Sequence, residues 1–359
     1  MRHIRPIALG AVALALLADL LLLRGMPARP AGLDHDPVVV RESDRARVFG
    51  MLERRRLNVR HYDTLDALAD SLRANPETFP DGSPVLGALY EQGFGTVDQP
   101  DDPAQWERHL DRLREWMDTR PQSNTARVAL AEALIGRGWA ARGGGWASSV
   151  SESQERRFET DLGDAMLLLS QCSPEARSDP QWYRAMMRAL HGLGEEQDSA
   201  YRATFYEAIA RFPDDPRFYV GMAGHLLPRW YGVPGQWEKF TGETVTVLPE
   251  SLGVEIYARI VTDESRYTDT LFRDSPTLSW ELTARGLDAW ERHHPLSRHP
   301  RSARALLAWQ AGRREDARRA FAAVGDTVDL DVWHSVGRYR TARHWADGGS
   351  GLTAASWGR

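Results

Sequence analysis

The sequence predicts an all-α protein: an irregular array of helical hairpins similar to tetratricopeptide units, preceded by one N-terminal membrane helix. From Arg41 onward, apolar residues mostly recur at spacings of three and four, which is the pattern of amphipathic helices. Brief turns rich in proline, glycine and aspartate separate these segments, so successive helices are expected to be neighbours. No stretch shows sustained period-two alternation, and TVTVL at residues 244–248 is the only strand-like run. One continuous α-helical repeat-like domain over residues 41–346 is therefore expected.

Residues 1–32 are expected to form a signal anchor. Arg2 and Arg5 precede an apolar run from Ile7 to Leu23, which a single aspartate interrupts. A positive start followed by an apolar run is typical of a secretory signal, and this run is at the short end for a membrane span. No clean small-x-small cleavage site follows, so an uncleaved anchor is preferred to a cleaved signal peptide. We expect a single-pass protein of the cell membrane whose main domain is periplasmic.

Three segments of the main domain carry a clear apolar face. The positions expected to be buried are Trp106, Leu110, Leu113 and Trp116/Met117 in the first segment, Phe158, Leu162, Ala165/Met166 and Leu169 in the second, and Tyr201, Phe205, Ala208/Ile209 and Phe212 in the third. Ser151 and Gln154 have the spacing of a capping box at the start of the second segment. Ser275 and Pro276 have the pattern of an N-cap and first residue of a later helix.

The best hairpin candidate is residues 299–325, whose two expected helix faces carry alanines where helices approach closely. Those faces comprise Ala305, Leu306 and Trp309, then Ala317, Ala320 and Phe321. The hairpin period along the chain is not regular, so no repeats are counted. Residues 75–103 are expected to be irregular, and residues 347–359 to be a disordered tail.

Composition argues against some classes of protein. The formal net charge is −5, whereas proteins that neutralise a phosphate backbone usually show a basic stripe, so no nucleic acid is expected as a partner. Lys239 is the single lysine among 45 basic residues, and the arginines are spread along the whole chain, which favours a compositional bias over a recognition surface. Cys172 is the single cysteine, which excludes an intramolecular disulfide and a thiolate-rich metal site.

The stretch LLPRWYGVPGQWEKF, residues 226–240, is the first candidate site. Pro228 is expected to end one helix, Gly232 to close the turn with a positive φ, and Pro234 to suit the start of the next helix. The aromatic residues of this corner are explained most simply as packing area. The functional alternative is a groove whose rim carries Arg229, Trp230, Glu238 and Lys239, with Tyr231 and Trp237 as further candidate binding residues.

The second candidate site is RGWAARGGGWASSVSE, residues 137–152. Trp139 and Trp146 flank the Gly143–Gly145 run, whose central residue is Gly144. A glycine-rich loop before a helix can bind an anion through backbone N–H groups. This loop follows a helix and lacks the Gly-Lys-Ser/Thr ending of a phosphate-binding loop. A flexible turn with local serine caps is the simpler explanation.

A third group, Glu291, His293, His294 and His299, combines residue types that bind zinc. It lacks the His-Glu-x-x-His spacing of a metalloprotease, so a solvated helix end is expected and no metal is predicted. The chain also lacks a Gly-x-Ser-x-Gly elbow and a dinucleotide fingerprint. No catalytic residues and no cofactor are therefore predicted, and an enzymatic activity is not favoured.

Several segments occur here in a characteristic order: ARVALAEALIGRGWAARGGGWASSVSE, DPQWYRAMM, FYVGMAGHLLPRWYGVPGQWEKF and EIYARI. Together they make the chain resemble the bacterial proteins grouped as domain of unknown function 4034, over roughly residues 63–345. The resemblance implies a helical fold and singles out the two segments rich in tryptophan and glycine, but it carries no activity. The segment VTDESRY at residues 261–267 departs from the family pattern, so a pocket formed there would differ.

Two hypotheses about function follow. The first is a membrane-anchored helical-repeat protein that binds a protein or peptide partner in a concave groove, where aromatic and arginine side chains are favoured. The alternative is a small-ligand binding protein or enzyme, with a pocket between the Gly143–Gly145 turn and the Arg229–Trp237 corner. Whether these two segments meet in space is the observation that matters most for the site.

Overall fold

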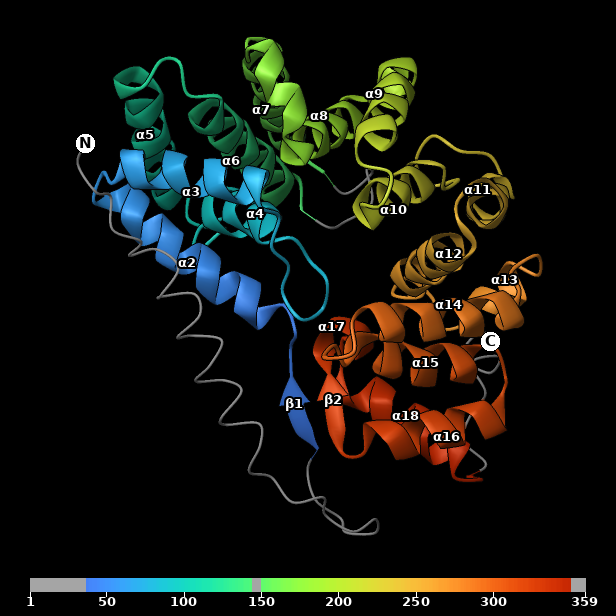
Figure 1. Cartoon of the computed structure of the whole chain (residues 1–359). Coiled ribbons are helices and arrows are strands. Elements are labelled where there is room, and N and C mark those ends of the chain that lie inside the picture. Colours follow the sequence, from blue (N-terminus) through green and yellow to red (C-terminus); the bar gives the residue numbers. More distant parts are fainter. Residues whose placement is uncertain (1–36, 144–149, 350–359) are drawn as a thin grey trace. The chain divides into compact units, whose positions relative to one another are not determined.

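The computed structural model describes residues 37–143 and 150–349 of the chain (Figure 1). From Val38 on, these residues belong to one compact unit. Helices make up most of this unit, and its sheet consists of two short strands. The expected all-helical, repeat-like architecture is therefore confirmed for this part of the chain. None of the described helices is long and apolar enough to cross a bilayer, and the predicted anchor lies outside the described residues.

The elements follow one another with mostly short connections. The first group is β1 (Val38–Val40), α2 (Asp44–Asn58), α3 (Tyr62–Ala74), α4 (Val85–Ala88), the π-helical turn η1 (Leu89–Phe94), α5 (Pro103–Thr119) and α6 (Asn124–Arg142). The middle group is α7 (Glu152–Ser170), the 3-10 turn η3 (Pro174–Ser178), α8 (Pro180–Leu193), the 3-10 turn η4 (Glu195–Gln197), α9 (Asp198–Arg211) and α10 (Pro216–His225). The last group is α11 (Gln236–Val247), α12 (Glu250–Glu264), α13 (Leu271–Asp274), α14 (Trp280–His293), α15 (His299–Gln310), α16 (Arg314–Val324), β2 (Thr327–Asp329), α17 (Leu330–Trp333) and α18 (Val336–Ala346).

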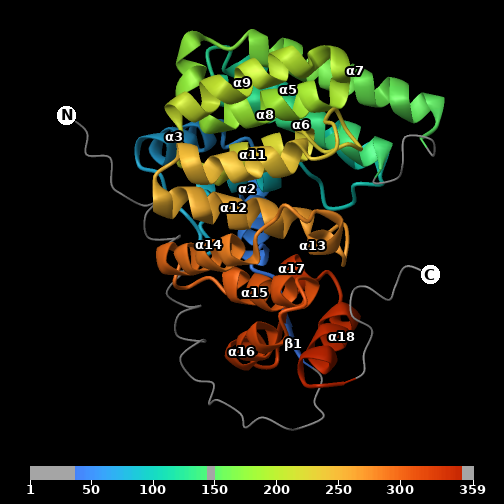
Figure 2. The same cartoon turned by 90° about the vertical axis from the view of Figure 1, so that its right-hand side faces the viewer.

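Helices that are consecutive in the chain pack against each other, as in a helical-hairpin array. The most extensive contacts join α6 with α7, α7 with α8, α11 with α12, α12 with α14, and α15 with α16. Figure 2 shows α11, α12, α14, α15 and α16 stacked in chain order. Each helix therefore buries its apolar face mainly against its sequence neighbours.

The predicted apolar faces are confirmed in all three segments. Most of their inward residues are fully buried, whereas Met117, Met166, Ile209 and Phe212 are partly buried and pack against the core. The Phe212 ring lies against Tyr183 with a centroid distance of 6.1 Å. Ser151 and Gln154 form the predicted capping box at the start of α7. The hairpin candidate is also confirmed, because α15 and α16 pack together through buried alanines and aromatic rings.

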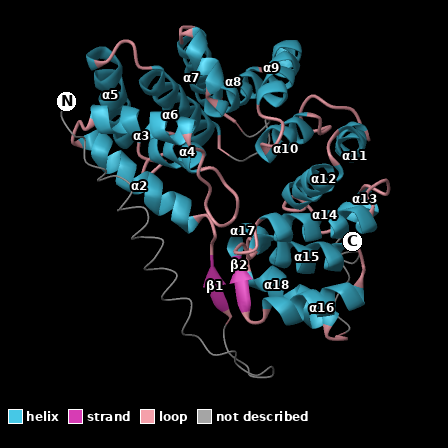
Figure 3. Cartoon of the chain, in the orientation of Figure 1, coloured by secondary structure: helices cyan, strands magenta, loops and turns pink. Residues whose placement is uncertain are grey.

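The strand-like run at residues 244–248 forms the end of a helix in the structure, and the strands lie elsewhere. Residues 244–248 lie at the end of α11, where the Thr244 hydroxyl donates to the Thr241 carbonyl at 2.8 Å and Thr244 is buried. Packing of Thr244 in the core favours the helix over the strand propensity of this run. The strands are β1 and β2, which pair in parallel with Val39 opposite Val328 (Figure 3). This pairing joins the start of the array to its C-terminal helices.

Two further expectations about local structure are wrong. The helix expected to begin at Ser275 begins at Trp280, because Ser279 is its N-cap and accepts the Leu282 N–H at 3.2 Å. Residues 75–103 are not irregular throughout: they contain α4 and η1, whose residue Phe94 is fully buried. Contacts with α2 hold this short helical segment in place. Of the predicted tail, only residues 347–349 are described.

Candidate functional site

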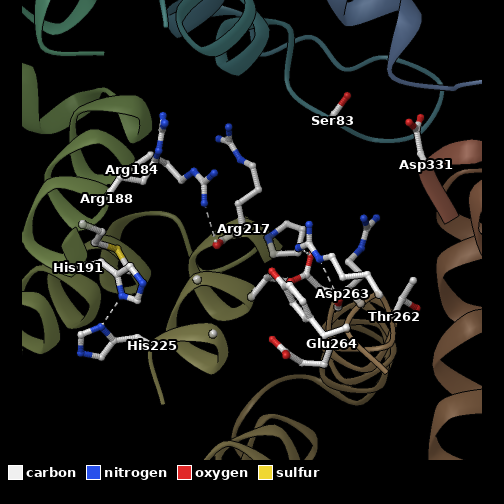
Figure 4. Close-up of a pocket in the computed structure, with 18 of the residues that line it drawn as sticks. Ser83, Arg184, Arg188, His191, Arg217, His225, Thr262, Asp263, Glu264 and Asp331 are labelled. Carbon is white, nitrogen blue, oxygen red and sulfur yellow. Dashed lines mark hydrogen bonds and ion pairs between the residues drawn. The ribbon is translucent and has the colours of Figure 1, made fainter. Parts of the chain in front are cut away.

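The inner side of the helical array contains a cavity of about 900 Å³, which we call the inner cavity. Its walls are formed by the loop at residues 81–84 and by α8, α10, α12 and α17, with Trp139 at the end of α6. Figure 4 shows Arg184, Arg188 and Arg217 side by side, with Asp331 on the opposite side of the view from His191. A cavity of this volume is in the range of known ligand pockets.

Three helices each direct one stripe of residues into the inner cavity. The stripes are Arg184, Arg188 and His191 on α8, Arg217, Gly221 and Gly224 on α10, and Arg259, Asp263 and Arg266 at and beyond the end of α12. Each stripe has the spacing i, i+4, i+7, which places its members on one helix face. Sequence reasoning missed these residues, although their spacing was visible, because arginines are frequent throughout this chain.

The starts of α8 and α10 are built in the same way. Each begins with an Asp-Pro pair, in which the aspartate caps the helix and the proline occupies the first turn. The Asp179 carboxylate accepts the Gln181 N–H at 2.8 Å, and the Asp215 carboxylate accepts the Arg217 N–H at 3.0 Å. These caps fix the first turn of both helices, and hence the direction in which their arginines project.

Carboxylates lie behind the arginines of α8 and α10, and they differ in burial: Glu132 is fully buried, whereas Asp215 and Glu91 keep 11 % and 28 % of their side-chain exposure. Arg188 donates to the fully buried Glu132 at 2.6 Å, and Arg217 donates to Asp215 at 2.6 Å. Arg184 contacts Glu91 at 3.4 Å. These carboxylates fix the guanidinium groups but do not themselves line the cavity. Planar guanidinium groups held in this way are suited to bind carboxylate or phosphate groups.

The carboxylates behind the arginines ionise differently. Burial opposes ionisation of Glu91, but Arg184 and Arg217 outweigh burial and hold its pKa below the usual value. Burial raises the pKa of Glu132 despite the nearby Arg188. The arginines therefore stabilise the charged form of Glu91, whereas the charge of Glu132 is costly and depends on its partners.

A second group on the cavity wall comes from residues 262–267, at the end of α12 and beyond it. Arg229 lies over the Tyr267 ring at 3.7 Å and contacts Glu264 at 3.7 Å. Glu264 is buried, and this burial, together with Asp263, raises its pKa to about 7. This segment therefore contributes a cation–π pair and a carboxyl group that is partly neutral near pH 7.

The two sequence-predicted segments meet at the inner cavity. The rings of Trp139 and Trp230 are in edge contact with centroids 6.1 Å apart, and the Arg142 guanidinium lies 5.5 Å from the Trp230 ring centroid. His191 contacts Trp230 with a centroid distance of 4.5 Å. We call Trp139, Arg142, His191 and Trp230 the aromatic cluster. Gly144 and Trp146 lie outside the described residues.

A chain of hydrogen bonds leads from the aromatic cluster to Asp198. His191 Nδ1 and His225 Nδ1 are 3.0 Å apart, and His225 Nε2 is 3.0 Å from Asp198 Oδ1. The carboxylate accepts, so His225 carries its proton on Nε2 and accepts from His191 at Nδ1. Burial, followed by His225 and Arg142, lowers the pKa of His191 to about 3. His191 is therefore neutral, with Nε2 as a hydrogen-bond acceptor.

The other residues predicted in the corner at 226–240 have different roles. The Tyr231 hydroxyl donates to the His191 carbonyl at 2.6 Å and so fixes the end of α8. Trp237 is buried in the core, and Glu238 accepts the Ser275 hydroxyl at 2.9 Å. Neither Trp237 nor Glu238 lines the inner cavity. Of this corner, the cavity wall includes Arg229 and Trp230.

The turn in this corner is closed by a different glycine from the one expected. Gly235 has a φ of 85° and is the N-cap of α11. Gly232 does not have a positive φ, but a Cβ there would lie 1.7 Å from the Leu226 carbonyl oxygen. Gly232 is therefore required by close approach of the backbone rather than by its torsion angle.

The histidine group predicted near residue 294 is divided by the structure. His293 Nδ1 bonds to Glu255 at 2.5 Å, and His294 Nε2 is 3.8 Å from the same carboxylate. Glu291 pairs with Arg301 at 2.6 Å. His299 is directed elsewhere, with Nδ1 3.6 Å from Asp329 Oδ2. The four residues therefore do not form one cluster.

Comparisons of the chain with family models, with curated proteins and with solved structures found no match. The resemblance to domain of unknown function 4034 therefore stays a prediction.

Proposed function

We propose that this chain is a tetratricopeptide-like binding protein, tethered to the cell membrane by its N-terminal segment, whose inner cavity binds an acidic segment of a protein or peptide partner. The observation that carries this proposal is the set of arginines, Arg184, Arg188, Arg217 and Arg259, that α8, α10 and α12 direct into one cavity of about 900 Å³. The tether rests on the apolar N-terminal run alone.

Charge and burial favour an acidic ligand. Side chains of Arg184 and Arg217 retain 20 % and 18 % of their exposure, so both are partly desolvated but accessible from the cavity. Their carboxylate partners, Glu91 and Asp215, orient the guanidinium groups but do not line the cavity. A ligand carboxylate would therefore meet guanidinium groups that are already oriented, at a small cost in side-chain entropy.

The aromatic cluster supplies apolar contact at one end of the same cavity. Trp139 and Trp230 are both partly buried and both line the cavity wall. Aromatic and arginine side chains are enriched where peptides and proteins bind tightly. The combination favours a peptide segment with acidic residues and at least one apolar or aromatic side chain.

The proposal is tested by fluorescence anisotropy with the full chain purified in mild detergent. The probe is a short fluorescein-labelled peptide of glutamate, leucine and tyrosine, and the matched peptide has glutamine in place of every glutamate. The acidic peptide should bind at least about tenfold more tightly, and added salt should weaken it. Equal binding of the two peptides would exclude recognition by charge.

A small anionic ligand is the second candidate, because a cavity of about 900 Å³ is in the range of small-molecule pockets. The hydrogen-bonded chain from His191 to Asp198 would then orient an acceptor nitrogen at the pocket wall. A thermal-shift series with citrate, pyrophosphate and glutamate separates the candidates. Strong stabilisation by one of these anions, with no binding of the acidic peptide, would favour the small ligand.

A further inference from the structure

A further group of side chains lies where the first strand meets the C-terminal helices, next to the inner cavity, whose wall includes one of its members, His299. Glu42 follows β1, Asp329 is the last residue of β2, and His299 is the first residue of α15. The parallel pairing of Val40 with Asp329 brings the three together. One oxygen of each carboxylate and one imidazole nitrogen lie within 4.8 Å of one another. Figure 1 shows β1 and β2 side by side at this junction.

The Asp329 carboxylate has one oxygen that is satisfied and one that is not. Asp329 Oδ1 accepts the Asp331 N–H at 3.0 Å, which fixes the orientation of the group. Asp329 is 0 % exposed, and Oδ2 has no hydrogen-bond partner among the described residues. A buried carboxylate oxygen without a partner is costly.

The unpartnered oxygen is directed at an imidazole nitrogen. Asp329 Oδ2 and His299 Nδ1 are 3.6 Å apart, which is too long for a hydrogen bond. It is close to the ligand–ligand distance of about 3.3 Å expected around a tetrahedral ion with bonds of about 2.0 Å. Two atoms at this separation can share one metal ion with a small adjustment.

The third ligand is held in place by the turn before α15. The Ser297 hydroxyl donates to Glu42 Oε2 at 2.7 Å, and the Arg298 N–H donates to Glu42 Oε1. Each carboxylate oxygen keeps a second lone pair for another partner. Hydrogen bonds of this kind orient metal ligands in known sites. The Glu42 carboxylate is therefore fixed beside His299 without being fully occupied.

We propose that Glu42, His299 and Asp329 bind one divalent transition-metal ion, with Zn²⁺ as the probe. One imidazole and two carboxylates are the ligand types of such ions, whereas Mg²⁺ and Ca²⁺ prefer oxygen ligands alone. Three protein ligands leave a further position for water or a ligand group. The ion would also connect β1 to α15 and β2, and so stabilise the pairing that joins the two ends of the helical array.

The test uses the full chain, without a histidine tag, treated with a chelator and then titrated with ZnCl₂ by calorimetry. One ion should bind per chain, and the unfolding temperature should rise with Zn²⁺ concentration. His299→Gln and Asp329→Asn should each weaken binding at least about tenfold. His293→Gln is the matched control, because His293 bonds to Glu255 outside the site. The Zn²⁺ affinity of this variant should equal that of the wild type.

Circular dichroism is used to check that each variant is folded. Glu42→Gln is a third variant of a proposed metal ligand, and the side chain that it replaces is partly exposed. The proposal is overturned if the wild type has no site with a Kd below about 100 μM. It is equally overturned if folded ligand variants keep the wild-type affinity, or if Ca²⁺ or Mg²⁺ binds in preference to Zn²⁺. Failure of acidic peptides to bind would leave this result unchanged, since the two sites are tested with different probes.

Discussion

Filling the inner cavity from one glycine should abolish binding of the acidic peptide without harming the fold. Gly224 lies within α10 and lines the cavity, and a Cβ added there meets no atom within 4 Å. Gly224→Phe therefore places a benzyl group in open space between the arginine stripes. Replacing glycine inside a helix should also stabilise the chain by about 0.5 kcal/mol, the difference between the helix propensities of glycine and phenylalanine.

The expected loss of affinity is at least about tenfold, or about 1.4 kcal/mol, because the aromatic ring takes up part of the 900 Å³ volume that the peptide needs. Gly163→Phe is the matched control. Gly163 is inside α7, a Cβ there also meets no atom within 4 Å, and the residue does not line the cavity. Anisotropy titrations and thermal unfolding of both variants provide the comparison. A folded Gly224→Phe chain with wild-type affinity would refute the placement of the ligand.

Three further predictions concern the cavity wall. The pKa of Glu264 in the folded chain is raised from 4.5 to about 7, so its ionisation should destabilise the fold by at most about 3 kcal/mol as pH rises from about 4.5 to 7. Glu264→Gln should therefore raise the unfolding temperature at pH 8 but not at pH 4. An equal effect of this variant at both pH values would contradict the prediction. Arg188→Leu should lower the free energy of unfolding by about 3 kcal/mol because it leaves the buried Glu132 without its cation. Adding Glu132→Leu should restore most of this stability in denaturant titrations, whereas additive losses of stability would argue against an Arg188–Glu132 ion pair. Nitrogen NMR should find the His191 imidazole neutral at pH 7 with its proton on Nδ1. Asp198→Ala should remove the preference for the Nδ1-protonated tautomer. A proton on Nε2 of His191 in the wild type would exclude the proposed chain of hydrogen bonds from His191 to Asp198.

Much of the helical fold could be predicted because apolar spacing within one helix is a local property. Trp106 and Trp116 fall on one face of α5 by their spacing alone, and both are buried. The prediction failed where two nearby serines could each cap the same helix. Ser275 has the sequence pattern of an N-cap, but Ser279 is the N-cap of α14 and the Ser275 hydroxyl donates to Glu238. A serine can satisfy either role, and tertiary contacts decide between them.

The candidate site could be predicted only in part, because its residues come from helices far apart in the sequence. Trp139 and Trp230 were identified from local composition, and their contact depends on the packing of α6 beside the corner after α10. Trp237, in the same corner, has the same composition but faces the core. The stripe of Arg184 and Arg188 was overlooked because one arginine-rich helix face resembles many others in this chain.

The central claim is that an acidic peptide binds within the inner cavity, and photo-crosslinking tests it most directly. An acidic peptide with a benzophenone side chain would be bound to the full chain, irradiated, and located by mass spectrometry. We predict crosslinks to α8, α10 and α12 that are lost in Gly224→Phe and kept in Gly163→Phe. Crosslinks confined to outer surfaces such as α7 or α16, unchanged in Gly224→Phe, would contradict the account.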